Sequence, residues 1–232
     1  IIAGVFFSRK LYKLNILTLG DYFRLRYNRT VEVLTTLCIV ASYLGWVSAQ
    51  IKALGLVFNV VTAGYVSQTA GMILGAAIVL TYTTFGGMLS VAILDFVQMG
   101  VIMGGMLYIG YVVSGLTGGV ELVINHASAA GKLDFFPPPD PWLWLTFLGA
   151  WITMMLGSIP QQDVFQRITS AKTQSIALWG SIIGASIYFC FTFVPMFIAY
   201  SATLIDPELF NGLLQTDSQL VLPTLVLNHT PV

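Results

Sequence analysis

The residue with the clearest chemical potential is Asp95, a carboxylate that stands inside an apolar stretch of the chain. Gln98 follows three residues later, so on a helix its amide would share a face with that carboxylate. Hard cations favour carboxylate and carbonyl oxygens over nitrogen or sulfur ligands. Asp95 and Gln98 are therefore candidates for a sodium pathway, with Asp95 as the candidate metal ligand. The alternative is a structural carboxylate that interacts with its own helix N-terminus or with a neighbouring arginine.

A second group of residues combines aromatic rings with an amide. Tyr43, Trp46 and Gln50 recur at i, i+3 and i+7, which places them on one stripe of a helix. Such a stripe can close over a small organic solute and offers cation–π contact if that solute is cationic. Trp151, midway along another apolar run, is a further candidate for the solute pocket. Ordinary helix packing is the alternative for all four residues.

Signatures of enzymatic chemistry are mostly absent from the sequence. The two histidines, His126 and His229, lie in segments that we predict to be outer loops, so they do not form a metal-binding pair on one helix face. Cys38 and Cys190 stand inside apolar runs, where cysteine commonly serves as a small packing residue. The chain also has no nucleophile-elbow motif and no phosphate-binding loop. We therefore predict that this protein is not an enzyme.

The elements that must position these residues follow from composition. Hydrophobic residues make up 56% of the 232 residues and charged residues only 9%, against about 25% charged residues in soluble domains. A soluble fold of this size would not have enough polar side chains to cover its surface. The same composition excludes a disordered chain, a basic nucleic-acid-binding protein and a disulfide scaffold. We predict an all-α integral membrane protein, a polytopic helix bundle.

Apolar runs of about 20 residues have the length of a membrane-spanning helix. Complete runs cover residues 31–58, 67–87, 91–116, 142–160 and 175–204. Residues 1–7 resemble the end of another span, residues 8–30 form a loop, and residues 205–232 form an outer segment after the last span. Because the chain starts with Ile1 and no signal-peptide pattern precedes it, we interpret it as an internal fragment forming one transmembrane domain.

Glycine and proline mark several of the boundaries. Gly86 and Gly87 predict a tight hairpin between two spans. Pro160 ends one span, and Pro195 lies inside the last one. Three glycine pairs spaced by four residues predict close helix contacts, and these pairs are Gly71/Gly75, Gly100/Gly104 and Gly180/Gly184.

The few charges are distributed unevenly between the loops. The loop 8–30 contains six of the ten basic residues, and the loop 161–174, which the spans place on the same side, adds Arg167 and Lys172. Lys52 and Lys132 lie toward the other side, together with most of the acidic residues. The positive-inside rule therefore predicts that the loops 8–30 and 161–174 are cytoplasmic. A polybasic lipid-binding segment is an alternative interpretation of residues 24–29.

Three motifs, in order, resemble those of the sodium:solute symporter family, which corresponds to solute carrier family 5. Residues 82–91 (YTTFGGMLSV), followed by Asp95 and Gln98, are similar to its signature region. Residues 18–23 (TLGDYF) with Arg26 and Tyr27 are similar to the loop after its third helix. Residues 160–167 (PQQDVFQR) with residues 170–172 (SAK) are similar to a later cytoplasmic loop.

This resemblance implies part of a leucine-transporter-type inverted-repeat fold, with a solute site near the midplane. It implies sodium-coupled symport of a small organic solute by alternating access, with sodium as the coupling ion and the lipid bilayer as the environment. The family's solutes include amino acids, sugars, carboxylates and quaternary amines. Asp95 matches a family position implicated in sodium binding or exit. Trp46 falls where choline-type members place an aromatic cage residue, whereas those members carry Trp where this chain has Gln161.

The resemblance also implies what the residues 1–232 do not contain. In this family the principal sodium site uses a broken second helix and a Ser/Thr-rich ninth helix, and neither corresponds to a span found here. The alternative function is a transporter-like sensor domain fused to a signalling module such as a histidine kinase. Both functions place a multi-pass protein in the cell membrane, and neither involves nucleic acid.

Overall fold

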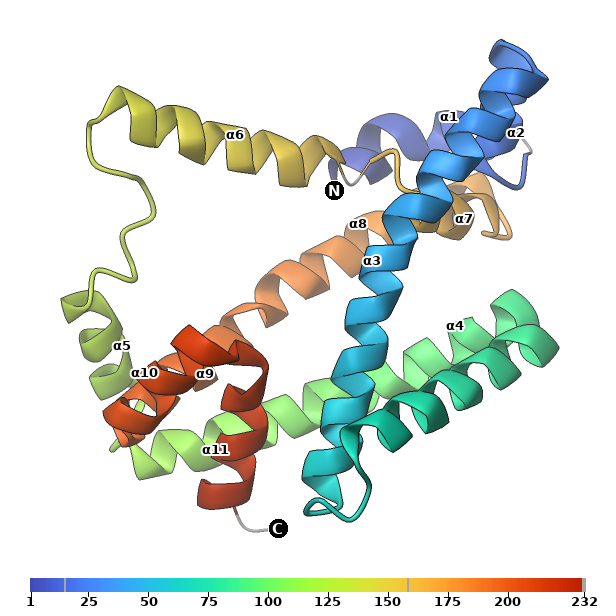
Figure 1. Cartoon of the computed structure of the whole chain (residues 1–232). Helices are drawn as coiled ribbons and strands as arrows, with labels where there is room; N and C mark the ends of the chain where they lie inside the picture. Colours follow the sequence, from blue (N-terminus) through green and yellow to red (C-terminus); the bar gives the residue numbers. More distant parts are fainter. Residues whose placement is uncertain (15, 158, 231–232) are drawn as a thin grey trace. The chain divides into compact units, whose positions relative to one another are not determined.

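The computed structural model describes residues 1–14, 16–157 and 159–230. Within these residues the chain is helical and contains no β-strand (Figure 1). This confirms the prediction of an all-α protein. The helices form two compact units, one made of Ile1–Leu44 and Asp134–Cys190 and the other of Gly45–Leu133 and Phe191–Val232.

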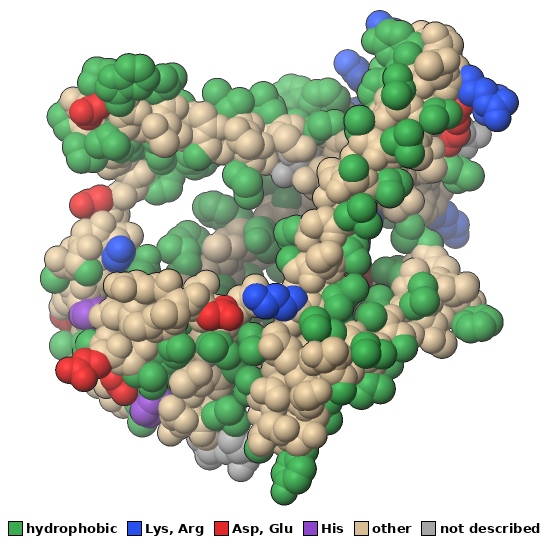
Figure 2. Space-filling model, in the orientation of Figure 1, with side chains coloured by type: hydrophobic (Ala, Val, Ile, Leu, Met, Phe, Trp, Pro, Cys, Tyr) green, Lys and Arg blue, Asp and Glu red, His purple; other side chains and the backbone are tan. Residues whose placement is uncertain are grey.

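Four helical stretches in the described residues are long and apolar enough to cross a membrane. They are Arg29–Val61, Gln68–Leu116, Pro141–Thr169 and Gln174–Ile205. In the most apolar window of each, at most 6% of the residues are buried against the rest of the chain. Green hydrophobic side chains accordingly cover much of the surface in Figure 2. Since a soluble protein rarely exposes so much apolar surface, the chain is a multi-pass membrane protein.

The first unit contains a short π-helix and several α-helices. They are η1 (Ala3–Phe7), α1 (Ser8–Lys13), α2 (Leu19–Arg26), the first part of α3 (Arg29–Val61), α6 (Pro141–Gly157), α7 (Gln162–Thr169) and most of α8 (Gln174–Phe191). The segment expected as a loop over residues 8–30 thus carries α1 and α2.

A capping box fixes the start of α2. The backbone N–H of Thr18 donates to the Asp21 carboxylate over 2.9 Å, and the backbone N–H of Asp21 donates to the Thr18 hydroxyl over 3.1 Å. The Thr18 hydroxyl also donates to the carboxylate, and this bond is the main reason why the pKa of Asp21 is lowered. Two backbone donors at the helix N-terminus are satisfied in this way.

The second unit packs around α9 (Phe193–Ile205). Its other elements are the rest of α3, α4 (Gln68–Leu116), α5 (Val120–Ala129), α10 (Pro207–Thr216), η2 (Ser218–Leu220) and α11 (Val221–His229). The buried core consists of apolar side chains from α4, α9, α10 and α11, namely Val113, Ile198, Ala202, Phe210, Val221 and Leu225. Residues after 204, expected only as an outer segment, therefore help to build this core.

The expected span 175–204 is divided between α8 and α9 at Thr192. Pro195 lies in the first turn of α9 and lacks a backbone N–H, so it cannot donate to the carbonyl of Phe191. Proline is tolerated in a first helical turn because the N–H groups there have no helical acceptor. The division therefore falls where the proline costs least.

The helix α4 contains the hairpin that the sequence predicts at Gly86 and Gly87. Gly87 has φ 56° and ψ −155°, which interrupts the helix, and Figure 1 shows α4 turning back on itself. Only glycine adopts this backbone region without strain. A methyl group at Gly86 would overlap the Ser90 side chain sterically, so this position is also restricted to glycine.

Glycines let α3 and the first part of α4 touch, and we call this contact the glycine seam, made by Gly55, Gly71 and Gly75. A methyl group at Gly55 would lie 2.5 Å from the carbonyl oxygen of Gln68, and one at Gly71 would lie 3.1 Å from that of Gly55. The predicted contact of Gly71 and Gly75 is therefore confirmed. Built methyl groups at the other two pairs, Gly100/Gly104 and Gly180/Gly184, meet nothing within 4 Å among the described residues.

Hydrogen bonds hold the turn that joins α3 to α4. The Asn59 side-chain amide donates to the carbonyl of Val66 over 2.9 Å, and the backbone N–H of Val66 donates to the Thr62 hydroxyl over 3.0 Å. Between them, Ala63 and Gly64 adopt positive φ angles of 50° and 85°. The turn and the glycine seam together tie the two helices into a firm hairpin.

Candidate functional site

Asp95 lies on the part of α4 that follows the break at Gly87. Its residue is half-buried, whereas Gln98, one turn further along the same helix, is exposed. The two side chains therefore share a helical face, as their spacing predicts. A carboxylate in this apolar helix costs about 2.5–3.5 kcal/mol even on the scale from membrane-insertion experiments, so Asp95 is a marked exception in α4.

Tyr43, Trp46 and Gln50 all lie on α3, the helix that the sequence predicts for them. Tyr43 is half-buried, Gln50 is exposed, and Trp46 is 64% exposed. This stripe of α3 thus presents a large aromatic surface that the described residues leave open. An exposed indole beside an amide provides both an apolar platform and a hydrogen-bonding group for a solute.

Trp151 belongs to a cluster of aromatic rings at α6 and the segment before it. Its ring centre lies 6.3 Å from that of Phe135 and 6.2 Å from that of Phe147. Phe136 stacks on Trp144 with their ring centres 5.8 Å apart. Such tilted and edge-to-face pairs stabilise one another by about 0.5–1.5 kcal/mol. Trp151 is still 49% exposed, so one side of its ring stays accessible.

A polar junction between α2, α3 and α7 was not expected from the sequence. The backbone N–H of Leu19 donates to the side-chain oxygen of Gln162 over 2.9 Å. Tyr43 interacts with both the backbone and the carboxylate of Asp163. The side-chain nitrogen of Gln162 is buried and has no hydrogen-bond partner among the described residues. We call Leu19, Tyr43, Gln162 and Asp163 the α2–α3–α7 junction.

The junction lies well along α3 and away from the start of that helix. Tyr43 follows Arg29 by fourteen residues, which corresponds to about 21 Å at 1.5 Å per residue. The start of α7 is therefore beside the middle of α3. The residue after α7 and its turn, Lys172, accepts a hydrogen bond from the Tyr12 hydroxyl on α1 through its backbone carbonyl over 3.2 Å. The segment 161–174 thus leads from the junction toward the basic α1.

One signal in the sequence could have indicated this junction. Pro160 ends an apolar run, and the polar residues Gln161, Gln162 and Asp163 follow it directly. Backbone that is not helical at membrane depth requires polar partners within the protein. The end of the apolar run at Pro160 predicts only a loop at these residues and does not indicate their partners.

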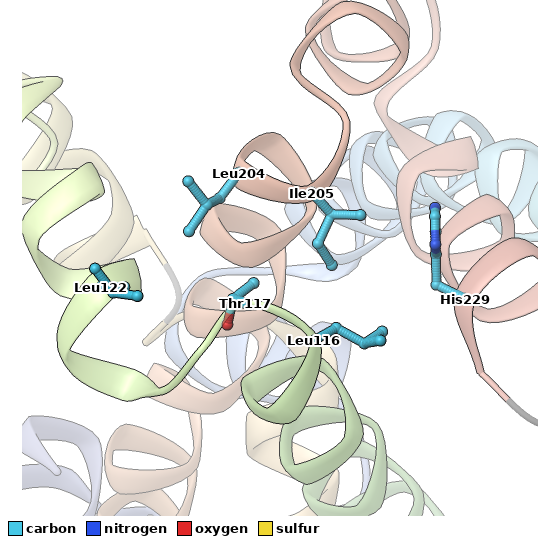
Figure 3. Close-up of a pocket in the computed structure, with 6 residues that line it drawn as sticks. All are labelled: Leu116, Thr117, Leu122, Leu204, Ile205 and His229. Carbon is cyan, nitrogen blue, oxygen red and sulfur yellow. The ribbon is translucent and has the colours of Figure 1, made fainter.

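A separate cavity of ≈ 370 Å³ lies in the second unit, among α4, α5, α9 and α11. Figure 3 shows that its walls are mainly leucine and isoleucine side chains, with His229 at one side. The hydroxyl of Thr117 donates to the carbonyl of Val113 in its own helix. None of the residues predicted for sodium or solute lines this cavity.

Comparison with known proteins places this chain in a family. High affinity choline transporter 1 of Homo sapiens is 28% identical over 196 residues, covering 80% of this chain and 32% of that protein. Sodium-coupled monocarboxylate transporter 2 of Danio rerio is 28% identical over 231 residues, covering 94% of this chain and 37% of that protein. Sodium-coupled monocarboxylate transporter 1 of Homo sapiens is 26% identical over 193 residues, covering 79% of this chain and 31% of that protein.

The chain therefore spans about a third of the length of these relatives. The model of the sodium:solute symporter family matches residues 1–232, and the three motifs noted in the sequence lie inside this match. By this match over its whole length, the chain belongs to the sodium:solute symporter family.

Proposed function

We propose that the full-length protein is a sodium-coupled secondary transporter that carries a small organic solute across the cell membrane by alternating access. The observation that carries this proposal is the family match over residues 1–232. The names of the relatives, which specify choline or sodium-coupled monocarboxylate transport, support it. Transport of this kind requires no covalent chemistry, in keeping with the scarcity of catalytic motifs.

Asp95 is the proposed sodium ligand, and Gln98 is proposed to share its pathway. Sodium is a cargo here and passes through the protein. If sodium binds one conformation more tightly than the other, its occupancy shifts the equilibrium toward that conformation, and solute binding to the same conformation couples the two fluxes. A half-buried carboxylate in an apolar helix is suited to such differential binding.

Tyr43, Trp46, Gln50 and Trp151 are the proposed solute-binding residues. We propose that the solute belongs to the amino acid, sugar, carboxylate or quaternary amine class. The charge of the junction residue Asp163 favours some of these classes over others. Its carboxylate interacts with Tyr43, so a cationic solute resting on the Tyr43 ring would meet a counter-charge. A carboxylate solute would instead meet a like charge. We therefore favour an amine-bearing solute over a simple carboxylate.

Uptake into proteoliposomes by the full-length protein tests this proposal. The solute panel contains a quaternary amine, an amino acid, a sugar and a monocarboxylate, each with and without a sodium gradient. Asp95→Asn should raise the sodium concentration for half-maximal uptake at least tenfold. Asp206→Asn is the matched control, because Asp206 caps α10 by accepting from the backbone N–H of Leu209 over 3.0 Å. Unchanged sodium dependence in Asp95→Asn would contradict its role.

A parallel pair of variants tests the solute class. Asp163→Asn should weaken uptake of amine solutes and leave uptake of the other solutes nearly unchanged. Asp21→Asn serves as control, because Asp21 is engaged in the capping box of α2. Equal effects of Asp163→Asn on all transported solutes would contradict the charge argument.

A further inference from the structure

A cavity in the first unit lies between η1, α7 and α8, and it differs from both proposed transport sites. Its volume is ≈ 570 Å³, within the usual range for ligand pockets. Small residues form much of its wall, and they include Gly4, Ala177, Gly180 and Gly184. A methyl group built at Gly180 or Gly184 would meet nothing within 4 Å among the described residues. These two glycines therefore leave an open groove along α8.

The groove follows α8 for a length somewhat shorter than one membrane leaflet. Gly4 contacts α8 so closely that a methyl group on it would lie 3.0 Å from the Ser181 side chain. Further along, Tyr12 reaches Lys172 before α8 begins. The helices η1 and α1 thus run alongside the same stretch of chain as the groove. From Ile176 to Gly184 the groove extends about 12 Å along the helix, somewhat less than half of the ~30 Å hydrocarbon core.

The two ends of this groove have opposite character. Toward Gly184 its lining is mainly apolar, and the hydroxyl of Ser181 there donates to the carbonyl of Ala177 over 2.7 Å, whereas at the other end Arg167 and Ser170 form part of the wall. Lys172 is exposed next to them. The helix α1, which packs against α7, carries three further exposed basic residues, Arg9, Lys10 and Lys13. In Figure 2, blue side chains gather where α1, α2 and the start of α3 lie.

We propose that this groove binds an anionic phospholipid. The phosphate group lies against Arg167, Ser170 and Lys172, and an acyl chain occupies the glycine-lined part along α8. Charge complementarity selects the headgroup, because basic side chains beside a membrane attract anionic lipids. The length and mainly apolar lining of the groove favour a lipid over a free anion, because a free anion would make no contact with the part of the groove lined by Gly180 and Gly184.

The test uses the full-length protein in nanodiscs of phosphatidylcholine with graded fractions of phosphatidylglycerol. We expect phosphatidylglycerol to raise the thermal unfolding midpoint and to be retained on the protein in native mass spectrometry. Arg167→Gln and Lys172→Gln should each weaken apparent affinity for phosphatidylglycerol about fivefold, the factor typical of one juxtamembrane cation. Gly184→Leu, which fills the groove and leaves the charge unchanged, should abolish retention of the lipid.

Matched controls separate a specific site from general attraction. Lys52→Gln and Lys132→Gln remove one cation each from outside the first unit, and both should leave the phosphatidylglycerol effect unchanged. Equal losses in all four cation variants would overturn the proposal in favour of unspecific attraction. The same holds if Gly184→Leu retains the lipid, or if inorganic phosphate in detergent reproduces the full stabilisation. A Gly184→Ser variant keeps the residue small and should behave as wild type, which guards against misfolding in Gly184→Leu.

Discussion

The glycine seam makes a sharp prediction for Gly55→Ala. The added methyl group would overlap the Met72 side chain and would lie 2.5 Å from the carbonyl oxygen of Gln68. Carbon atoms normally approach no closer than about 3.5 Å. The methionine can swing away, but the carbonyl belongs to the backbone of α4. The two helices must therefore separate by about 1 Å, and the packing along the seam is lost.

The size of this effect follows from two opposing contributions. Overpacking costs about 1–3 kcal/mol, and contact with backbone places this site at the upper end of that range. Replacing glycine by alanine within a helix stabilises it by about 1 kcal/mol. We therefore expect Gly55→Ala to lower the free energy of unfolding by about 2 kcal/mol. Gly45→Ala on the same helix meets nothing within 4 Å and should raise it by up to about 1 kcal/mol.

Unfolding of the purified protein in graded sodium dodecyl sulfate, followed by circular dichroism, measures this difference. The two variants have the same composition and should differ by about 3 kcal/mol, or more than a hundredfold in the unfolding equilibrium. The double variant Gly55→Ala/Gly71→Ala should lose less than the sum of its single changes, because the first methyl already opens the seam. Equal stability of Gly55→Ala and Gly45→Ala would refute a close contact between α3 and α4.

Three further predictions concern other parts of the chain. Gly87→Ala should cost about 1–3 kcal/mol in the same assay, because alanine at φ 56° and ψ −155° is strained, while Gly100→Ala should be neutral or stabilising. Phe210→Ala should cost about 3–5 kcal/mol, because Phe210 is fully buried in the core around α9. The lowered pKa of Asp21 stabilises α2 above the ordinary carboxylate pKa of about 3.9. That stabilisation is lost as the pH falls through the lowered pKa, and the loss should appear as faster amide hydrogen exchange in α2. Thr18→Ala, which removes the hydroxyl partner of Asp21, should give faster exchange in α2 already at neutral pH.

Composition and local patterns predict the architecture of this chain well. A low fraction of charged residues and long apolar runs are enough to indicate membrane helices, because the thickness of the bilayer sets the length of such helices. The break at Gly87 can also be predicted, since two adjacent glycines inside an apolar run favour a turn that other residues cannot make. The division at Thr192 is less obvious, because a proline inside a span predicts a disturbance but leaves its form open.

The contacts of the candidate site could not be predicted in the same way. Spacing alone makes Gly71 and Gly180 equivalent, but only Gly71 meets a neighbouring helix, since contact depends on where other segments lie. The interaction of Tyr43 with Asp163 joins residues 120 positions apart, and no local pattern encodes it. The sequence therefore indicates candidate functional residues, whereas the partners of these residues depend on tertiary packing.

The break at Gly87 has a mechanical consequence. Before Gly87, the glycine seam and the hydrogen-bonded turn hold the first part of α4 against α3. After Gly87 comes the part of α4 that carries Asp95. The two parts of α4 are joined through the φ and ψ angles of a residue without a side chain, so a change in those angles would change the direction of the segment that carries Asp95. Gly87 is thus the position in α4 where the direction of the helix can change at the lowest steric cost.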